Sequence, residues 1–421
     1  MVPDIGIVGA GVAGMHLGVL LRRGDIDVTV YADRSADELA RSRLLNAVMH
    51  HQGTLDREKR LGVGHWDGDR LGWRHRYQNV HGPDDARYSA AVPGASLALD
   101  YRVYLPALMA DFEQLGGRLV VRPVQLDELD AVSRRHDLLV VATGRGGMQL
   151  LFPVRADVAQ RAGAGRTICA ALVTGVSRPD PEGVTLSHAV GVGELIEFPL
   201  LTAQGMVTAL LFESLPGGPA DDLAGLSPAA DQKTFDARLL SALESHYPAT
   251  HERVDARSFE SVSPQDTLQG AVAPVMRQDF ARLTDGRPVI ALGDAHVLID
   301  PLTGQGANIA SYSAEVLGEA IIDDLGFDDH FCRRVAARRE HVLRAAFEWT
   351  NLALDAPAHL LNLHRAAVSS TDLASDLARR HPDPDLMWRT VATEQRVARY
   401  LRGFGITPGR TTTEDTRHDQ T

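Results

Sequence analysis

The chain has 421 residues, enough for two joined domains that share a large core. Its 55 acidic and 43 basic residues give a net charge of −12, which argues against a nucleic-acid partner and against attraction to an anionic membrane, and favours a small-molecule ligand. Cys169 and Cys332 are too few for a disulfide framework, and no long apolar span or signal peptide is apparent, so we expect a cytoplasmic protein.

A glycine-rich turn, GAGVAG, separates a buried strand predicted at 4–8 from a helix predicted from Met15 onward, and a second strand is predicted at 28–31. In such a unit the glycines allow a tight turn, close approach of the backbone to a pyrophosphate, and close packing of helix on strand. The helix N-terminus also favours an anion. We therefore predict a dinucleotide site that includes Gly9, Gly11, Val12, Ala13 and Gly14.

The acidic residue that usually binds the adenosine ribose, about 20 positions beyond the glycines, is displaced in this chain. Ala32 stands at the strand end where that residue is expected. Asp33 or Arg34 is therefore the candidate contact to the adenosine, and either residue fits a solvated strand end equally well.

Further elements of the nucleotide domain are predicted after an intervening segment that follows the strand at 28–31. Helical spacing over 105–115 follows Tyr101 and Arg102, and a strand is predicted at 118–121. A buried strand at 137–144 then ends in a turn at Thr143 and Gly144.

The pattern changes to alternation from about residue 166 to 275 and predicts a mostly antiparallel sheet. A hairpin with its turn at 204–205 joins strands at 193–198 and 206–212. We predict an exposed loop at 215–222 and a surface helix at 232–246. This sheet is the natural roof for a substrate pocket.

A second glycine motif, GDAHVLIDPLTGQGAN, follows a buried strand at 288–294 and precedes a helix at 309–325. An Asp at a strand end can accept hydrogen bonds from ribityl hydroxyls, and a glycine-rich helix start can direct N–H groups at the flavin pyrimidine oxygen. Together the two motifs suggest FAD. The residues predicted to bind it here are Asp294, Pro301, Gly304, Gly306, Ala307 and Asn308.

These patterns predict an α/β protein that resembles the FAD-binding fold of the 4-hydroxybenzoate hydroxylase superfamily. Within that superfamily the chain is most similar to the epoxidase component of the two-component styrene and indole monooxygenases. The similarity covers nearly the whole chain. It rests on the two glycine motifs and on the segments DVTVYADR, RLLNAVMH, DYRVYLPALM, DLLVVATG, GELIEFP and WTN.

The resemblance implies a Rossmann-type FAD-binding domain, an antiparallel substrate domain and C-terminal helices. The expected boundaries are 1–165 with 276–327 for the FAD domain, with about 45–100 bordering the substrate pocket, then 166–275 for the substrate domain, 328–405 for the helices and 406–421 for a disordered tail.

The resemblance also implies the reaction and its partners. FAD would arrive already reduced from a separate NADH-dependent flavin reductase and would react with dioxygen to give a flavin C4a-hydroperoxide. That species would transfer oxygen to a small apolar aromatic alkene, such as styrene, to give an epoxide. A homodimer is compatible with this assignment.

By the same resemblance, Arg43, Leu44 and Leu45 lie along the flavin, and Arg102, Thr143 and Gly144 contact the cofactor. Asn46 and His50 are the candidate catalytic residues, and Val48 and Ser96 belong to or border the substrate side. Core packing is an equally good interpretation of Val48, as is a structural hydrogen bond for His50 and Ser96.

The chain departs from the styrene pattern at one segment. Trp73 stands where Tyr is expected, and Arg74, His75 and Arg76 replace a stretch with His expected at position 76. We treat Trp73, His75 and Arg76 as candidate substrate contacts. The two added cations could point outward, or they could admit a polar substituent on the substrate.

Several alternatives stay open. They are an indole monooxygenase of the same family, a self-sufficient NADPH-dependent aromatic hydroxylase, and a non-catalytic flavoprotein. A flavin-dependent halogenase would need a relay Lys and a WxWxIP signature, whereas this chain has Lys59 and Lys233 and no such signature. The scattered histidines lack metal-ligand spacing, so no metal is expected.

Overall fold

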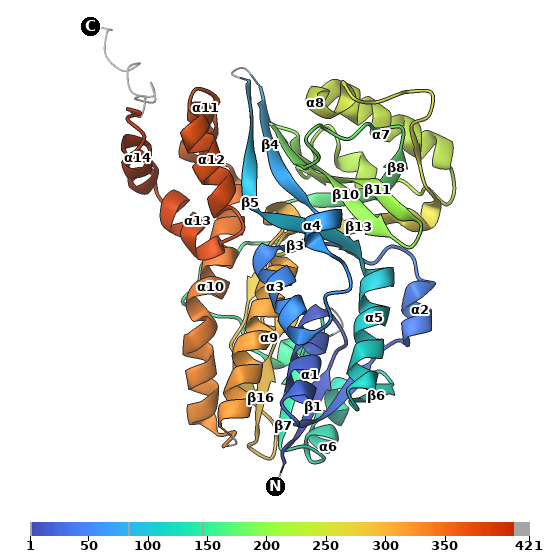
Figure 1. Ribbon diagram of the computed structural model, residues 1–421, viewed down its shortest axis with the longest axis vertical. Helices are drawn as coiled ribbons and strands as arrows, with labels where there is room; N and C mark the ends of the chain where they lie inside the picture. The colour runs from blue at the N-terminus through green and yellow to red at the C-terminus, as the bar shows by residue number, and fades with distance from the viewer. Residues whose placement is uncertain (1, 83–84, 145–146, 325, 408–421) are drawn as a thin grey trace, which may run out of the picture.

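The computed structural model describes residues 2–82, 85–144, 147–324 and 326–407. Most of the tail expected at 406–421 therefore lies outside the described residues. Within the described ranges, the helices are too short or too polar to cross a membrane. Two large sheets and the helices around them make up the molecule (Figure 1).

A six-stranded sheet carries the first glycine motif. Its strands pair in parallel, except for the antiparallel edge strand β15. Alternate residues of the central strands are buried on opposite faces, which explains why these segments read as continuous apolar runs. In order across the sheet, the strands are β15 (Phe280–Arg282), β16 (Pro288–Ala291), β7 (Leu138–Val141), β1 (Asp4–Val8), β2 (Asp27–Ala32) and β6 (Arg118–Val121).

Three long helices pack on one face of this sheet, as Figure 1 shows in the lower half of the molecule. They are α1 (Val12–Arg23), α5 (Tyr101–Gln114) and α9 (Gly306–Asp323). Each begins earlier than its apolar spacing suggested, because the first turns carry glycines or polar residues. At α5, the Asp100 carboxylate accepts a hydrogen bond from the Arg102 N–H, so the helix starts at Tyr101 and not at 105.

A nine-stranded sheet forms the other half. Its pairings are antiparallel apart from two parallel contacts, β4 with β9 and β5 with β10. In order, the strands are β12 (Glu260–Ser261), β8 (Thr167–Thr174), β11 (Gly205–Ser214), β10 (Gly193–Thr202), β9 (Val184–Ala189), β4 (Trp73–His81), β5 (Ala86–Asp100) and β3 (Ala47–His51), with β13 (Thr267–Ala271) also beside β8.

The predicted hairpin is confirmed as β10 and β11, in which Thr202 pairs with Gly205 across the turn. Gly205 has φ +112°, a conformation that favours glycine. Helix α7 (Gln232–His246) covers one face of the hairpin, where its Phe235 packs in a cluster with Phe212. The segment predicted as an exposed loop at 215–222 is only partly exposed, because Ala220 is buried in the same cluster.

Residues 328–405 are helical, as predicted. Helix α10 (Asp329–Asp355) runs beside α9 in the lower half of the molecule (Figure 1). Four shorter helices gather beside the β4–β5 hairpin: α11 (Ala358–Val368), α12 (Thr371–Arg380), α13 (Pro384–Val391) and α14 (Glu394–Arg402). The remaining elements are short: α2 (Ala36–Ala40), α3 (Gln52–Leu61), α4 (Gly68–Leu71), α6 (Leu129–Ser133), α8 (Pro248–His251), and the paired strands β14 (Val275–Met276) and β17 (Val297–Leu298).

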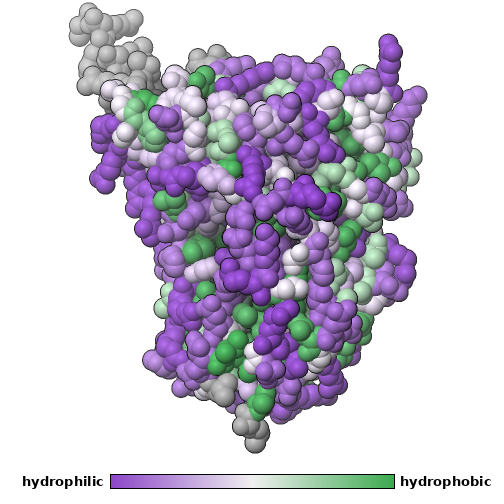
Figure 2. All heavy atoms as spheres, viewed as in Figure 1, coloured by the Kyte–Doolittle hydropathy of each residue, from purple (hydrophilic) through white to green (hydrophobic). Residues whose placement is uncertain are grey.

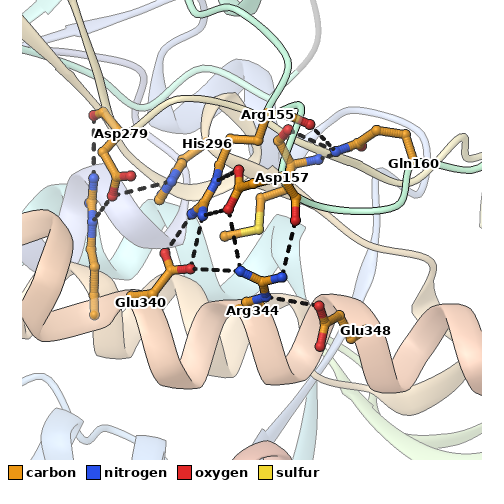
Figure 3. Close-up of polar contacts among 10 residues, drawn as sticks. Arg155, Asp157, Gln160, Asp279, His296, Glu340, Arg344 and Glu348 are labelled. Carbon is orange, nitrogen blue, oxygen red and sulfur yellow. Dashed lines mark hydrogen bonds and ion pairs between the residues drawn. The ribbon is translucent and has the colours of Figure 1, made fainter. Parts of the chain in front are cut away.

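A cluster of charged side chains fastens α10 to the rest of the molecule (Figure 3). Arg155 pairs with Asp157 and with Glu340 of α10, while Arg344 reaches Asp157 and Glu348. Beside them, Asp279 lies 3.1 Å from the guanidinium of Arg339, which is fully buried. Because each of these carboxylates and guanidinium groups has a partner, the buried charges are compensated.

The face of the molecule in Figure 2 is mostly hydrophilic, with hydrophobic residues scattered among polar ones. The apolar residues are concentrated instead in buried clusters on the two sheets. The two sheets and α9 are therefore held by a common core, which also positions the cavity between the glycine motifs and the nine-stranded sheet.

Candidate active site

A cavity of about 730 Å³ is lined by residues of both large sheets. Both glycine motifs contribute to its wall, as the sequence predicted. Most of the expected cofactor and substrate residues meet there. They are Gly9, Gly11, Val12, Ala13, Asp33, Arg34, Arg43, Leu44, Leu45, Asn46, Arg76, Thr143, Gly144, Asp294, Pro301, Gly304, Gly306 and Ala307.

The first motif has the geometry of a diphosphate site. Gly9 has φ +116°, and a Cβ added at Gly14 would lie 2.0 Å from the Gly9 carbonyl oxygen, so both positions need glycine for the turn and the helix packing. At Gly11, in contrast, an added Cβ would meet nothing within 4 Å. The backbone there is open to the cavity.

The two motifs approach each other at Gly293, where an added Cβ would lie 3.0 Å from the Ala13 Cβ. Gly306, at the start of α9, also has nothing within 4 Å of an added Cβ. Neither α1 nor α9 has an acidic residue in its first turn or a side-chain cap among the described residues. Two helix N-termini with available N–H groups therefore open onto one cavity, and this fits the phosphates and the pyrimidine ring of FAD.

The remaining cofactor positions include polar groups on the cavity wall. The Thr143 hydroxyl is buried and has no hydrogen-bond partner within the described part of the chain. Burial, reinforced by the nearby Asp294 carboxylate, raises the pKa of Tyr101, which also lines the cavity. Asp33 and Arg34 both lie on the wall and pair with each other at 3.4 Å.

Asn308 lies outside the cavity wall, where it holds the second motif in place. Its amide nitrogen donates to the carbonyl oxygens of Met49 (2.9 Å) and Gly304 (2.8 Å). Its amide oxygen accepts from the His51 N–H (3.0 Å) and the Thr54 hydroxyl (2.8 Å). Asn308 thus joins the start of α9 to β3 and α3.

The nine-stranded sheet supplies an apolar wall. Facing residues of neighbouring strands, such as Phe198 and Ala209, and Ile196 and Leu211, line the cavity side by side. The opposite face of the same strands packs on α7. Such a wall suits an apolar substrate placed against the flavin.

The sequence left two interpretations of His50 open, a catalytic role and a structural hydrogen bond. The His50 side chain is fully buried outside the cavity wall, with its Nδ1 atom 2.7 Å from the Glu58 carboxylate and its ring edge-on to Tyr104. The Tyr104 hydroxyl donates to the same carboxylate at 2.6 Å. Burial would raise the pKa of Glu58, but its interactions with His50, His16 and Tyr104 together lower that pKa. This network joins β3, α3 and α5.

Ser96, Trp73 and His75 do not line the cavity. Ser96 accepts or donates a hydrogen bond at 2.9 Å to His51, and Trp73 is buried in the apolar cluster that includes Phe198 and Leu302. The His75 ring packs against Tyr77. Val48 belongs to β3, but its side chain lies outside the described residues.

Arg102 is also separated from the cavity wall. Its guanidinium pairs with the carboxylates of Asp100 and Asp266, each at 2.6 Å. These contacts fasten the start of α5 to the loop before β13.

Sequence reasoning missed several wall residues. Residues 122–125 follow β6 at the carboxyl edge of the parallel sheet, where ligands of such sheets bind, so their position could have identified them. Met49 and His381 also line the cavity. His381 follows α12, more than 300 positions from Met49, and no local pattern marks it.

An acid pair adjoins the second motif. Asp300 lines the cavity, and its carboxylate accepts a hydrogen bond from the Leu302 N–H at 3.1 Å. Burial raises the pKa of the neighbouring Glu213 well above its usual range, and contact with Asp300 adds to the effect. Burial also raises the pKa of Asp300, so both acids of the pair hold their protons more tightly than usual.

Comparisons with solved structures define the fold class. A flavin-dependent brominase, Bmp2, is 15% identical with a TM-score of 0.66, covering 96% of this chain and 99% of that one. The 2-methyl-3-hydroxypyridine-5-carboxylic acid oxygenase is 14% identical with a TM-score of 0.60, covering 90% and 97%. The chain thus has the fold of flavin-dependent oxygenases and halogenases, as the sequence predicted.

Sequence comparisons narrow the class to one family. Styrene monooxygenase StyA from Pseudomonas sp and from Pseudomonas fluorescens are each 36% identical over 408 residues, covering 96% of this chain and 98% of each relative. A model described as "Styrene monooxygenase A putative substrate binding domain" matches residues 144–253. The chain belongs to the styrene monooxygenase family and is a flavin-dependent monooxygenase.

Proposed function

We propose that this chain is the oxygenase component of a two-component system and epoxidises a styrene-like aromatic alkene. It would use dioxygen and FAD that a separate NADH-dependent reductase supplies in reduced form. The observation that carries the proposal is the single cavity in which two helix N-termini face an apolar sheet wall.

Bound reduced FAD would supply the two electrons that let one oxygen atom of dioxygen add across the alkene while the other leaves as water. The alkene loses no proton in this reaction, so the apolar wall needs no general base. The chain's own task is to hold the substrate in line, to keep water out, and to hold FAD at Gly11 and Gly306. Asn46, on the cavity wall, stays the candidate catalytic residue, and His50 is assigned a positioning role through Glu58.

External reduction is supported by what the sequence contains. Apart from GAGVAG near the N-terminus, we find no dinucleotide fingerprint that would hold a nicotinamide. Thr143-Gly144 stands at the strand end where single-component hydroxylases carry Asp-Gly. The self-sufficient alternative predicts that NADPH alone bleaches the bound flavin.

The halogenase alternative is disfavoured by the position of the lysines. Lys59 on α3 and Lys233 on α7 are both exposed, and neither lines the cavity. A relay lysine would have to lie on the cavity wall.

The test supplies the protein with FAD, NADH, an unrelated flavin reductase and air, offers styrene and indole in parallel, and separates products by chiral chromatography. Styrene oxide in excess of any indole product supports the proposal. Preferred oxidation of indole would move the chain to the indole branch. Hydrogen peroxide as the sole product from both would refute the substrate assignment.

A further inference from the structure

Arg76 differs from the rest of the cavity's sheet wall. Its strand, β4, pairs in parallel with β9, and Arg76 is in register with Val184, which lines the same cavity. The neighbouring wall residues Leu186, Ile196 and Phe198 are apolar. Among the described residues of the nine-stranded sheet that line the cavity, Arg76 alone is charged.

The Arg76 guanidinium has no hydrogen bond or ion pair to another residue in the described part of the chain. Other interior arginines are paired: Arg166 binds Glu194, and Arg339 binds Asp279. Burial lowers the pKa of Arg76 from 12.5 to about 10, so the group keeps its charge at neutral pH. Arg76 is half-buried, and a cation taken partly out of water without a partner is costly. An anionic group of a ligand in the cavity would supply that partner.

The groups around Arg76 are neutral. Tyr88 on β5 and His364 on α11 share a hydrogen bond of 2.8 Å. Burial, with the Arg76 charge, lowers the pKa of His51 and of His364 to about 3, and lowers that of His381 well below its usual value. These rings can donate or accept hydrogen bonds, but they cannot neutralise the guanidinium.

We propose that the substrate is an aromatic alkene bearing a carboxylate, and that Arg76 binds this carboxylate while the sheet wall packs on the ring. The inference rests on the proposed epoxidation and names its substrate class. A guanidinium and a carboxylate match in charge and can form two parallel hydrogen bonds. The carboxylate takes no part in the oxygen transfer and fixes where the alkene lies.

The test compares kcat/KM for styrene, 4-vinylbenzamide, and 2-, 3- and 4-vinylbenzoate, with reduced FAD supplied by a reductase. We expect at least one vinylbenzoate to exceed both neutral substrates by tenfold or more. In Arg76→Gln, the ratio of kcat/KM for that vinylbenzoate to kcat/KM for styrene should fall by roughly 30-fold, through KM, because a charge-assisted hydrogen bond is lost.

Arg74→Gln is the matched control. Arg74 is two positions away on β4, but it is exposed and pairs with Asp69, so the preference should not change. A binding measurement separates the proposed carboxylate site from the proposed epoxidation, because it needs no reaction. The saturated ethylbenzoate of the same isomer should bind the FAD-loaded wild type in calorimetry and bind Arg76→Gln at least tenfold more weakly.

Each outcome decides one of the two hypotheses. Arg76-dependent binding of ethylbenzoate without any epoxide would contradict the proposed function and leave the carboxylate site standing. Epoxidation of styrene with no preference for any vinylbenzoate would overturn the carboxylate site alone. Weaker FAD binding in Arg76→Gln, with unchanged substrate preference, would assign the cation to the cofactor and likewise overturn it.

Discussion

At Gly11 the fold itself does not require a glycine, whereas the proposed cofactor site does. It has φ −77° and ψ −174°, which any residue can adopt, and a Cβ there meets nothing within 4 Å. We therefore expect Gly11→Val to weaken FAD binding by at least tenfold, because the side chain enters the space for the pyrophosphate, while apoprotein stability stays the same. Flavin fluorescence titration and thermal unfolding measure the two effects.

Gly14→Val is the control for Gly11. A Cβ at Gly14 would lie 2.0 Å from the Gly9 carbonyl oxygen, so this variant should lose several kcal/mol of stability or fail to fold. A Gly11→Val variant that binds FAD normally would show that the pyrophosphate lies elsewhere.

Glu213 provides a prediction about pH. Burial, with Asp300 beside it, raises the pKa of Glu213 in the folded protein well above the unfolded value of about 4.5. The protonated Glu213 side chain therefore adds its full contribution to the free energy of unfolding below the unfolded pKa. That contribution is lost as pH rises through the folded pKa. Glu213→Gln has nearly the same shape but does not titrate.

The measurement for Glu213 is the urea midpoint of both proteins from pH 5 to pH 9. We expect the wild type to lose stability relative to Glu213→Gln as pH rises, since only the wild type must ionise the buried acid. Parallel curves would mean that Glu213 is already ionised in the folded protein.

At the scale of elements, Asn308 joins the first turn of α9 to β3 and α3. Asn308→Ala removes four hydrogen bonds, two of them to the carbonyl oxygens of Met49 and Gly304. We expect a loss of about 3 kcal/mol in the free energy of unfolding, measured by urea denaturation. Asn362→Ala on the half-buried face of α11 is the control and should cost less than about 0.5 kcal/mol. Equal effects would mean that the Asn308 contacts add little stability.

The elements also mark what the sequence could predict. Strand β1, strand β6 and helix α7 were predicted at their observed bounds because their apolar spacing is local and unbroken. Strands β4 and β5 were not predicted. β4 carries four positively charged or imidazole side chains, and β5 contains Pro93 and Gly94. Their place in the sheet depends on distant partners, which no local pattern reveals.

In the candidate site, too, local patterns could be predicted and positions that depend on distant partners could not. The glycine motifs are local, so Gly11 and Gly306 could be placed on the cavity from the sequence alone. The sequence alone could not show that Arg76 faces the cavity while Arg74 faces solvent, since residues 74 and 76 would share a face in a regular strand. A bulge between Trp73 and His75 shifts the register, so that Arg74 is exposed and Arg76 lines the cavity.

At the scale of the whole molecule, the six-stranded and nine-stranded sheets line one cavity, and ion pairs fasten α10 beside the six-stranded sheet. The glycine motifs and the apolar wall therefore face the same cavity. In the proposed reaction, this arrangement would let reduced FAD bind beside the substrate.

The most direct test of the central claim is a single turnover with chemically reduced FAD, styrene and ¹⁸O₂, without NADH or any reductase. The account predicts styrene oxide that carries one ¹⁸O atom, whereas free reduced FAD under the same conditions should give none. Hydrogen peroxide with no labelled epoxide, although FAD is bound, would contradict it.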